Sequence, residues 1–344
     1  MCAPSGTQLL VRSTTPHTLR AVADAAQRIG ARAEIDGGTC TLTGAGSTEL
    51  LAALAGSLTG PEQREARGLF VSAPAADLDD ALRRGMAAEP LAVLAGQHRS
   101  GALADALGRP EVFTSHYQPI IRLADGATVA HEALLRTTGL EPALAPGPMF
   151  AEAIEAGWVH VLDRIGRERA IEGAAGWLGG DDLFVNFTPS SIYRPEVCLA
   201  TTEAAARRAG VPLTQVVFEV VETERVRDVG HLQRIVDHYR ALGVRVAVDD
   251  VGSGFASLNL VAELGPDVIK IDMDIVQRLP DPAALAVART LVNLAHEIGA
   301  LVVAEGLETE EQRAVVTDLG ADLGQGWLLG RPAPPPVPLA ASAL

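Results

Sequence analysis

The stretch Val-Ala-Val-Asp-Asp-Val-Gly-Ser-Gly-Phe-Ala-Ser-Leu, residues 246–258, indicates the fold class most directly. A short apolar run, typical of a buried strand, leads into adjacent carboxylates at Asp249 and Asp250, and glycines follow at 252 and 254. Ligands and metals bind at the carboxyl ends of strands in parallel α/β architectures, so this stretch has the form of a site. The alternative is a strand-to-helix turn capped by Asp249. If the strand continued through both aspartates, their side chains would point to opposite faces.

Apolar β-type runs alternate with helical patterns from residue 111 to about residue 332, close to the ~250 residues usual for a β/α barrel. Asp125-Gly126 favours an antiparallel hairpin between the first two strands, and Asp281 with Pro282 and Thr309 with Gln312 are typical helix starts. The expected strands are 113–123, 127–133, 183–187, 216–220, 244–248, 268–271, 301–304 and 322–323. The chain is therefore predicted to have an α/β fold, with a modified (β/α)8 TIM-type barrel over residues 111–334.

Residues 1–85 follow a different order and are predicted to form a smaller α+β domain. Strands at 9–11 and 69–71, a hairpin around Gly37 and Gly38, and helices opened by Thr15 with Pro16 and by Ser47 give the order β-α-β-β-α-β, with a last helix expected at 77–84. This order is typical of the split β-α-β pattern of ferredoxin-like domains. The segment shows no cluster of metal-ligating residue types, so we expect a regulatory, dimer-contact or structural role. Residues 86–110 read as a helical linker and residues 335–344 as a Pro/Ala-rich tail.

Composition excludes several classes of protein. With 48% hydrophobic residues, the 344 residues can build the cores of two domains. The three cysteines, Cys2, Cys40 and Cys198, are too scattered for a disulfide framework or a zinc cluster. The formal charge of -15 argues against general nucleic-acid binding. Because the sequence has no long uncharged apolar window and no signal-peptide pattern, we expect a cytoplasmic protein without a membrane segment.

Polar side chains collect at the ends of the predicted strands, where a barrel would gather them into one pocket. They are Glu132, Asn186, Glu219, Asp249, Asp250, Lys270, Glu305 and Gln325. Oxygen donors without Cys or His suit Mg²⁺ or Mn²⁺ rather than zinc, and divalent cations are the usual remedy for carboxylates that repel one another. Ordinary alternatives are a surface pair of Glu132 with Arg136, a rim salt bridge between Lys270 and Asp272, and helix-start acids at Glu305 and Glu308.

The same residues carry a family resemblance. His131-Glu132-Ala133-Leu134-Leu135-Arg136 resembles the signature of the EAL-domain cyclic di-GMP phosphodiesterases. Seven further strings stand in that family's order over about 113–332, and none lies in the first domain. They are Tyr117-Gln118-Pro119-Ile120, Val185-Asn186-Phe187-Thr188, Glu219-Val220-Val221-Glu222, Asp249-Asp250-Val251-Gly252-Ser253-Gly254, Lys270-Ile271-Asp272, Ala304-Glu305-Gly306-Leu307-Glu308-Thr309 and Gln325-Gly326.

The resemblance implies a barrel that holds two Mg²⁺ or Mn²⁺ ions and hydrolyses cyclic di-GMP to linear pGpG. By the same resemblance, the first ion would be held by Glu132, Asn186, Glu219 and Asp249, and the second by Asp249 as a bridge with Asp250 and Glu305. Lys270 would orient or deprotonate the attacking water, with Glu305 the other candidate base. Gln118, Arg136 and Gln325 would contact the substrate. Glu222 and Glu308 would brace the loop 251–257, which couples dimerisation to metal binding in that family, so we expect a homodimer.

Three departures from the family pattern suggest slower turnover or weaker dimer-linked activation. Thr137 and Val251 replace aromatic residues and Val221 replaces a threonine; comparing the wild-type rate with that of Val251→Phe tests this hypothesis. Two other functions stay open: a cyclic di-GMP receptor without turnover that signals through its first domain, and a barrel enzyme of carbon-acid chemistry with Lys270 as base. We expect His131 to be a buried or rim histidine and Trp327 to pack in the core.

Overall fold

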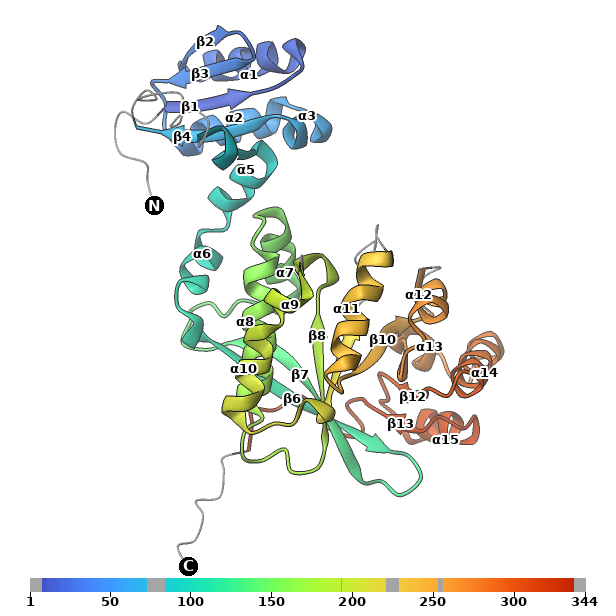
Figure 1. Ribbon diagram of the computed structural model, residues 1–344. Helices are drawn as coiled ribbons and strands as arrows, with labels where there is room; N and C mark the ends of the chain where they lie inside the picture. Colours follow the sequence, from blue (N-terminus) through green and yellow to red (C-terminus); the bar gives the residue numbers. More distant parts are fainter. Residues whose placement is uncertain (1–7, 73–83, 193, 221–228, 253–255, 337–344) are drawn as a thin grey trace, which may run out of the picture. The chain divides into compact units, whose positions relative to one another are not determined.

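The structure, a computed structural model, describes residues 8–72, 84–192, 194–220, 229–252 and 256–336 (Figure 1). The chain divides into two compact units. The first comprises Met1–Gly108 with Gly147–Val159, and the second comprises Arg109–Pro146 with His160–Leu344. Most of the helix expected at 77–84 lies outside the described residues, as does the greater part of the tail 335–344.

The first unit is built on a five-stranded sheet in the order β2-β3-β1-β4-β5. Its strands are β1 (Gln8–Arg12), β2 (Arg32–Asp36), β3 (Thr39–Thr43), β4 (Arg67–Val71) and β5 (Glu89–Pro90), and every pairing is antiparallel. Helices α1 (Pro16–Arg28) and α2 (Ser47–Ser57) pack against each other, and α1 lies on β1, β2 and β3 (Figure 1). The first four strands therefore have the split β-α-β arrangement that the sequence predicts.

The core of the first unit extends into the segment expected to be a linker. That segment is largely helical, with α5 (Leu91–Arg99) and α6 (Gly101–Leu107), and α3 (Gly60–Glu65) precedes β4. Leu91 is 2% exposed and belongs to the core that Leu9 and Val11 of β1 also form. A Cβ at Gly68 would lie 2.7 Å from Cδ2 of Leu91 and from Cδ1 of Leu94, so the side chains of α5 pack directly onto the backbone of β4. Helix α5 is thus part of the first unit.

The second unit is a closed barrel of eight strands in the order β10-β11-β12-β13-β6-β7-β8-β9. They are β6 (Phe113–Arg122), β7 (Thr128–Thr137), β8 (Asp182–Phe187), β9 (Val216–Val220), β10 (Arg245–Val251), β11 (Val268–Ile271), β12 (Leu301–Ala304) and β13 (Leu323–Gly324). Strand β6 is antiparallel to both of its neighbours, and the other pairs are parallel. The Asp125-Gly126 turn supplies the reversal, since Gly126 has a φ of 73°. The predicted α/β modified barrel is confirmed.

Each barrel strand contributes one apolar residue to a layer inside the barrel. This layer consists of Ile120, Ala130, Phe184, Val217, Ala247, Val268, Val303 and Leu323, all at most 8% exposed. Because side chains alternate along a strand, the residues between point outward, and Val185, Phe218 and Val248 pack in the larger core beneath the helices. The barrel is therefore filled, and a site on it must lie at an open end.

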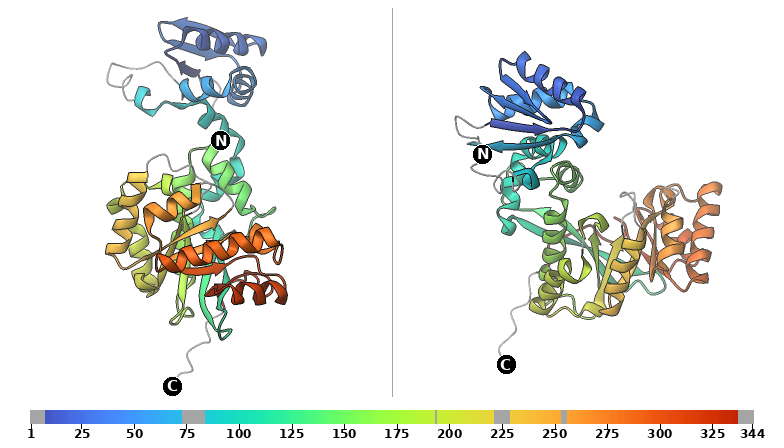
Figure 2. Two further views of the ribbon diagram at one scale, coloured as in Figure 1. Left: turned by 90° about the vertical axis from the view of Figure 1, so that its right-hand side faces the viewer. Right: turned by 45° about the horizontal axis from the view of Figure 1, so that its top comes forward.

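The helices of the second unit lie outside the strands (Figure 2). They are α8 (Val159–Gly173), α9 (Pro195–Cys198), α10 (Ala200–Ala209), α11 (Val229–Ala241), α12 (Ala256–Leu264), α13 (Met273–Val276), α14 (Pro282–Glu297) and α15 (Glu310–Asp318), with short turns η1 (Pro110–Val112), η2 (Pro189–Ser191) and η3 (Leu213–Gln215); α7 (Pro146–Glu155) falls almost wholly in the first unit. The predicted starts at Asp281 and Thr309 are confirmed by side-chain caps. Among the described residues no helix is long and apolar enough to cross a membrane.

Candidate active site

The predicted site residues form the layer directly above the apolar interior. On each parallel strand the site residue stands two positions after the interior residue, and on antiparallel β6 it stands two positions before, so all point into the same end of the barrel. This layer consists of Gln118, Glu132, Asn186, Glu219, Asp249, Lys270, Glu305 and Gln325. The structure therefore brings together eight residues that span more than 200 positions of sequence.

Lys270 stands at the centre of the site and is 1% exposed. Its Nζ lies 2.6 Å from Glu219 Oε1 and 2.6 Å from Glu305 Oε1. It also lies 3.3 Å from Asp249 Oδ1 and 3.5 Å from Glu132 Oε2. The rim salt bridge to Asp272 is wrong, because Asp272 caps α13 through the backbone N–H of Asp274. A surface pair of Glu132 with Arg136 is also wrong, because Glu132 is buried.

Two amide side chains orient the carboxylate of Glu132, and a third amide contacts one of them. Gln325 Nε2 donates to Glu132 Oε2 at 2.6 Å, and Asn186 Nδ2 donates to Glu132 Oε1 at 3.0 Å. Gln325 Nε2 also lies 3.2 Å from Gln118 Oε1, and Gln118 Nε2 donates to the carbonyl of Gly330 at 3.0 Å. Because Asn186 uses its N–H₂ in this way, its side-chain carbonyl oxygen remains available as an acceptor or ligand atom.

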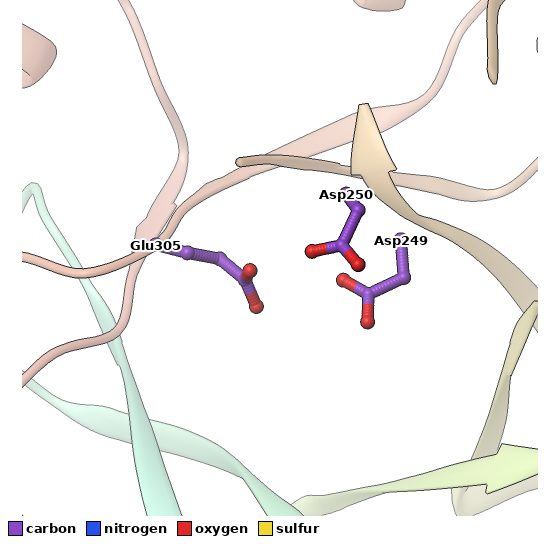
Figure 3. A group of neighbouring side chains, drawn as sticks. All are labelled: Asp249, Asp250 and Glu305. Carbon is purple, nitrogen blue, oxygen red and sulfur yellow. The ribbon is translucent and has the colours of Figure 1, made fainter. Parts of the chain in front are cut away.

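A bulge at the end of β10 places both aspartates on the same side. Asp250 has a φ of 53°, the left-handed conformation that Asp tolerates better than most residues. The register between β10 and β11 shifts between Val248 and Val251. Figure 3 shows the carboxylates of Asp249 and Asp250 turned toward that of Glu305, and one oxygen of each lies within 4.8 Å of the others. The strand continues past Asp249, as one of the two expectations had it. The side chains of Asp249 and Asp250 nevertheless lie on the same side, because the bulge interrupts the alternation of side chains along the strand.

Burial and mutual repulsion shift the pKa values of the acidic groups. Burial, then the neighbouring carboxylates, raise the pKa of Glu305 to about 8 and that of Asp250 to about 6. The same causes raise the pKa of Glu219 well above its ordinary value. For Glu132, burial opposes ionisation, yet the Lys270 ammonium and the hydrogen bonds from Gln325 and Asn186 lower the pKa. Burial also opposes the charge of Lys270, but the surrounding carboxylates raise its pKa well above the ordinary value.

The residues fit a divalent cation. Within the described part of the chain, the buried atoms Glu219 Oε2 and Gln325 Oε1 have no hydrogen-bond partner, and Glu219 Oε1 and Asp249 Oδ1 have none besides the nearby Lys270 ammonium. Buried oxygens without partners are costly unless a ligand satisfies them. Carboxylate and amide oxygens are hard donors that favour Mg²⁺ or Mn²⁺, as the sequence predicts.

The open end of the barrel forms a pocket of about 380 Å³ over these groups. Met273, Gln277, Glu308 and Trp327 line its rim. The expectation that Trp327 packs in the core is wrong, because its side chain is 58% exposed and Arg331 lies 4.3 Å from the centre of its ring. The pocket thus offers an aromatic face beside a charged floor.

The other predicted residues have varied surroundings. Arg136 shares its strand face with Glu132, and its Nη1 donates to the carbonyl of Leu135 at 2.8 Å. Glu308 accepts a hydrogen bond from Gln277 at 3.3 Å. Glu222, like Val221, lies outside the described residues. His131 is a partly buried histidine that contacts Asp181 at 3.2 Å, away from the pocket, as expected.

Sequence reasoning missed the rim residues Met273, Gln277 and Trp327, which follow the motif residues by only two to seven positions. It also missed a direct signal for the site. The chain has 28 Lys and Arg residues, and Lys270 is the only lysine among them. A single lysine at the end of a predicted strand is therefore a direct indication of the site.

A closed β/α barrel that gathers carboxylate and amide oxygens around one lysine at its open end defines the class of this unit: a β/α-barrel protein with a buried acidic site. The model of the EAL domain matches residues 100–332, and the chain belongs to this family. An uncharacterized signaling protein of Caulobacter vibrioides is 35% identical over 227 residues, which cover 64% of this chain and 27% of the relative. The cyclic di-GMP phosphodiesterase NbdA of Pseudomonas aeruginosa is 30% identical over 235 residues, covering 66% of this chain and 30% of that protein.

Solved structures agree with the family assignment. The standalone versatile EAL protein from Vibrio cholerae, in its c-di-GMP bound form, has 32% identity and a TM-score of 0.58, and covers 64% of this chain and 92% of that one. The chain spans about a third or less of the length of four curated relatives that it matches. The family is thus established for the second unit, while the activity of the whole protein is a matter for proposal.

Proposed function

We propose that this protein is a metal-dependent phosphodiesterase that hydrolyses cyclic di-GMP to linear pGpG. The observation that carries the proposal is the closed layer of carboxylates around Lys270 beneath an open pocket. Relatives that bear the name of this activity, or that were solved with c-di-GMP, support the choice of substrate.

The cations of this proposal are two Mg²⁺ or Mn²⁺ ions. Glu132, Asn186, Glu219 and Asp249 would hold one, and Asp249, Asp250 and Glu305 would hold the other. When bound, such a pair of ions lowers the pKa of water and stabilises the charge on the entering and leaving oxygens of a phosphodiester. The unpartnered Oε2 of Glu219 and the same-side aspartates of the β10 bulge support this division.

Lys270 and Glu305 would manage charge and protons during the reaction. The Lys270 ammonium keeps its proton at neutral pH, so it suits a role in orienting the attacking water and offsetting phosphoryl charge. Glu305 is the other candidate base: its pKa is about 8 in the metal-free site, and a bound cation would favour the ionised form that can accept a proton from water. Both side chains are in contact, at 2.6 Å, so they act as one unit.

Substrate contacts would come from the rim and from β6, β7 and β13. Gln118 and Gln325 lie at the pocket floor and can hydrogen-bond the sugar-phosphate backbone. Arg136, on the same face of β7 as Glu132, can pair with a phosphate by its forked guanidinium. The exposed ring of Trp327 offers a flat surface to a guanine base.

The first unit would regulate this activity, and the active form would be a cytoplasmic homodimer. The support is that the first unit has its own core and that its described residues show no group of metal-ligating side chains, which suits a sensing role. Bracing of the loop 251–257 by Glu222 and Glu308 would link the dimer to the metal site.

Turnover of cyclic di-GMP by the full chain with Mg²⁺ or Mn²⁺, resolved by chromatography, tests the proposal. We expect linear pGpG from the wild type, and a loss of at least 100-fold in Glu132→Ala, because that variant removes a cation ligand and its hydrogen bonds. Glu297→Ala, at an exposed position of α14, is the matched control and should retain full activity.

Two other outcomes would redirect the assignment. Tight binding of cyclic di-GMP without cleavage would favour the receptor function. Absence of both cleavage and binding would reject cyclic di-GMP as the ligand and leave the carbon-acid alternative.

A further inference from the structure

A buried ion pair on α8 lies outside the pocket and has no role in the proposed chemistry. Asp163 and Arg167, one helical turn apart, are 3% and 2% exposed. Arg167 Nε donates to Asp163 Oδ2 at 2.9 Å. Arg167 is also among the largest fully buried side chains of the described chain, so its burial is a substantial feature of this part of the fold.

The carboxylate of Asp163 holds the segment that follows β8. The backbone N–H of Thr188 donates to Asp163 Oδ1 at 2.7 Å, and the hydroxyl of Ser191, the last residue of η2, donates to Oδ2 at 2.8 Å. Thr188 stands two residues after Asn186. Asp163 therefore fixes the chain immediately after Phe187, where the strand that carries Asn186 ends.

Arg167 connects this segment to a second helix. Its Nη1 donates to the hydroxyl of Thr202 on α10, which is 1% exposed. Helix α8, turn η2 and helix α10 thus meet at one pair of opposite charges, and every polar side chain in the group is at most 5% exposed.

The energetics of such a pair suggest a purpose other than stability. Desolvating two charges offsets most of their attraction, and apolar residues of similar volume often hold helices together as well or better. An apolar residue at position 163, however, could not accept the Thr188 N–H or the Ser191 hydroxyl. What the carboxylate adds is a fixed direction for the backbone after β8.

We propose that Asp163 is a positioning residue for the cation site, acting through Asn186. By fixing Thr188, it holds Asn186 so that Nδ2 donates to Glu132, at 3.0 Å, and the carbonyl oxygen faces the cation. The inference rests on the proposed function, because it requires Asn186 to be a ligand. Arg167 orients the Asp163 carboxylate by donating its Nε–H to Oδ2 at 2.9 Å.

Mn²⁺ binding to the full chain, measured by calorimetry without substrate, tests this role. The variant Asp163→Leu/Arg167→Met replaces the pair by apolar groups and leaves no unpaired charge. We expect its Mn²⁺ affinity to fall roughly tenfold or more, the size of effect seen when partners of a metal ligand are removed. Ser191→Ala, which removes one hydrogen bond and no charge, should weaken Mn²⁺ binding by a smaller factor. This variant tests the inference even if the double variant does not fold.

Thr202→Val is the matched control, because it removes a buried hydrogen bond from Arg167 but none from the segment after β8. It should lower the unfolding temperature while leaving Mn²⁺ affinity unchanged. Wild-type affinity in Ser191→Ala and in the folded double variant would overturn the inference, as would an equal loss in Thr202→Val. Binding of Mn²⁺ by the wild type but not by Glu132→Ala would support the cation site, whatever the Asp163 and Ser191 variants do. Absence of Mn²⁺ binding by the wild type would overturn both the proposed function and this inference.

Discussion

At the scale of single residues, the Lys270 ammonium neutralises the buried carboxylates of the site when no cation is bound. Four carboxylates lie within 3.5 Å of its ammonium, a concentration of negative charge that would otherwise be unfavourable in a buried layer. A cation at the same carboxylates would take over part of this neutralisation. Lys270 is thus a structural countercharge as well as the candidate catalytic group.

The single lysine makes this role measurable. With lysine labelled by ¹⁵N at Nζ, the protein should give one side-chain ammonium signal, absent in Lys270→Met. Because its pKa is raised, the signal should remain in the charged form past pH 10.5, the ordinary lysine value, whereas titration below that pH would contradict the structure. Lys270→Met should lower the metal-free free energy of unfolding by about 3–5 kcal/mol at pH 8, because it leaves buried carboxylates uncompensated.

At the scale of elements, the bulge in β10 determines whether both aspartates can share a site. The left-handed conformation at Asp250 is one that Asn also adopts readily and that Ala does not. Gly252, two residues after Asp250, has a φ of 112°, which favours glycine, and a Cβ there would lie 2.2 Å from Cδ1 of Ile275. Val251 between them is fully buried.

Two substitutions at Asp250 separate the backbone role from the carboxylate. At pH 5, where Asp250 with its pKa of about 6 is mostly protonated, Asp250→Asn should leave the free energy of unfolding within about 0.5 kcal/mol of wild type. Asp250→Ala should lose about 1–2 kcal/mol at the same pH from the strain of a left-handed alanine. Both should lose most of the proposed activity, since both lack the ligand. Denaturant unfolding beside turnover checks this, and equal stability of the two variants would contradict the strained bulge.

At the scale of the whole molecule, the shifted acids tie stability to pH and cations. The folded protein holds protons on Glu305, with a pKa of about 8, and on Asp250, with a pKa of about 6, more tightly than the unfolded chain does. Their stabilisation is complete below the ordinary values of 4.5 and 3.8 and is lost as pH rises through 8 and 6, respectively. A bound cation favours the ionised forms and reverses this loss.

We therefore expect the unfolding temperature of the metal-free protein to fall by several degrees between pH 6 and pH 8.5. Mg²⁺ should raise the unfolding temperature more at pH 8.5 than at pH 6. Glu305→Gln should flatten the pH dependence without added metal. Thermal unfolding across this range with and without Mg²⁺ provides the measurement, and a Mg²⁺ effect of equal size at both pH values would argue against proton displacement.

Much of the fold follows from local pattern. The barrel strands at 216–220, 268–271 and 301–304 match the predicted ranges, because each is a short apolar run bounded by turn or capping residues. The layer of site residues follows in turn, because alternation on a strand fixes which side chains share a face. Segment ends were less predictable: β7 extends to Thr137, four residues past the expected end, through pairing with β6.

The sequence by itself determined the barrel, its order of strands and the residues at their carboxyl ends, because these depend on periodicity and spacing along the chain. Tertiary structure alone decided the rest. It turned Asp249 and Asp250 to one side through a bulge, exposed Trp327 at the rim, surrounded Lys270 with four carboxylates and joined Asp163 to the segment beyond Asn186. These outcomes depend on which distant groups meet in a low-dielectric interior, where desolvation and pairing outweigh local preference.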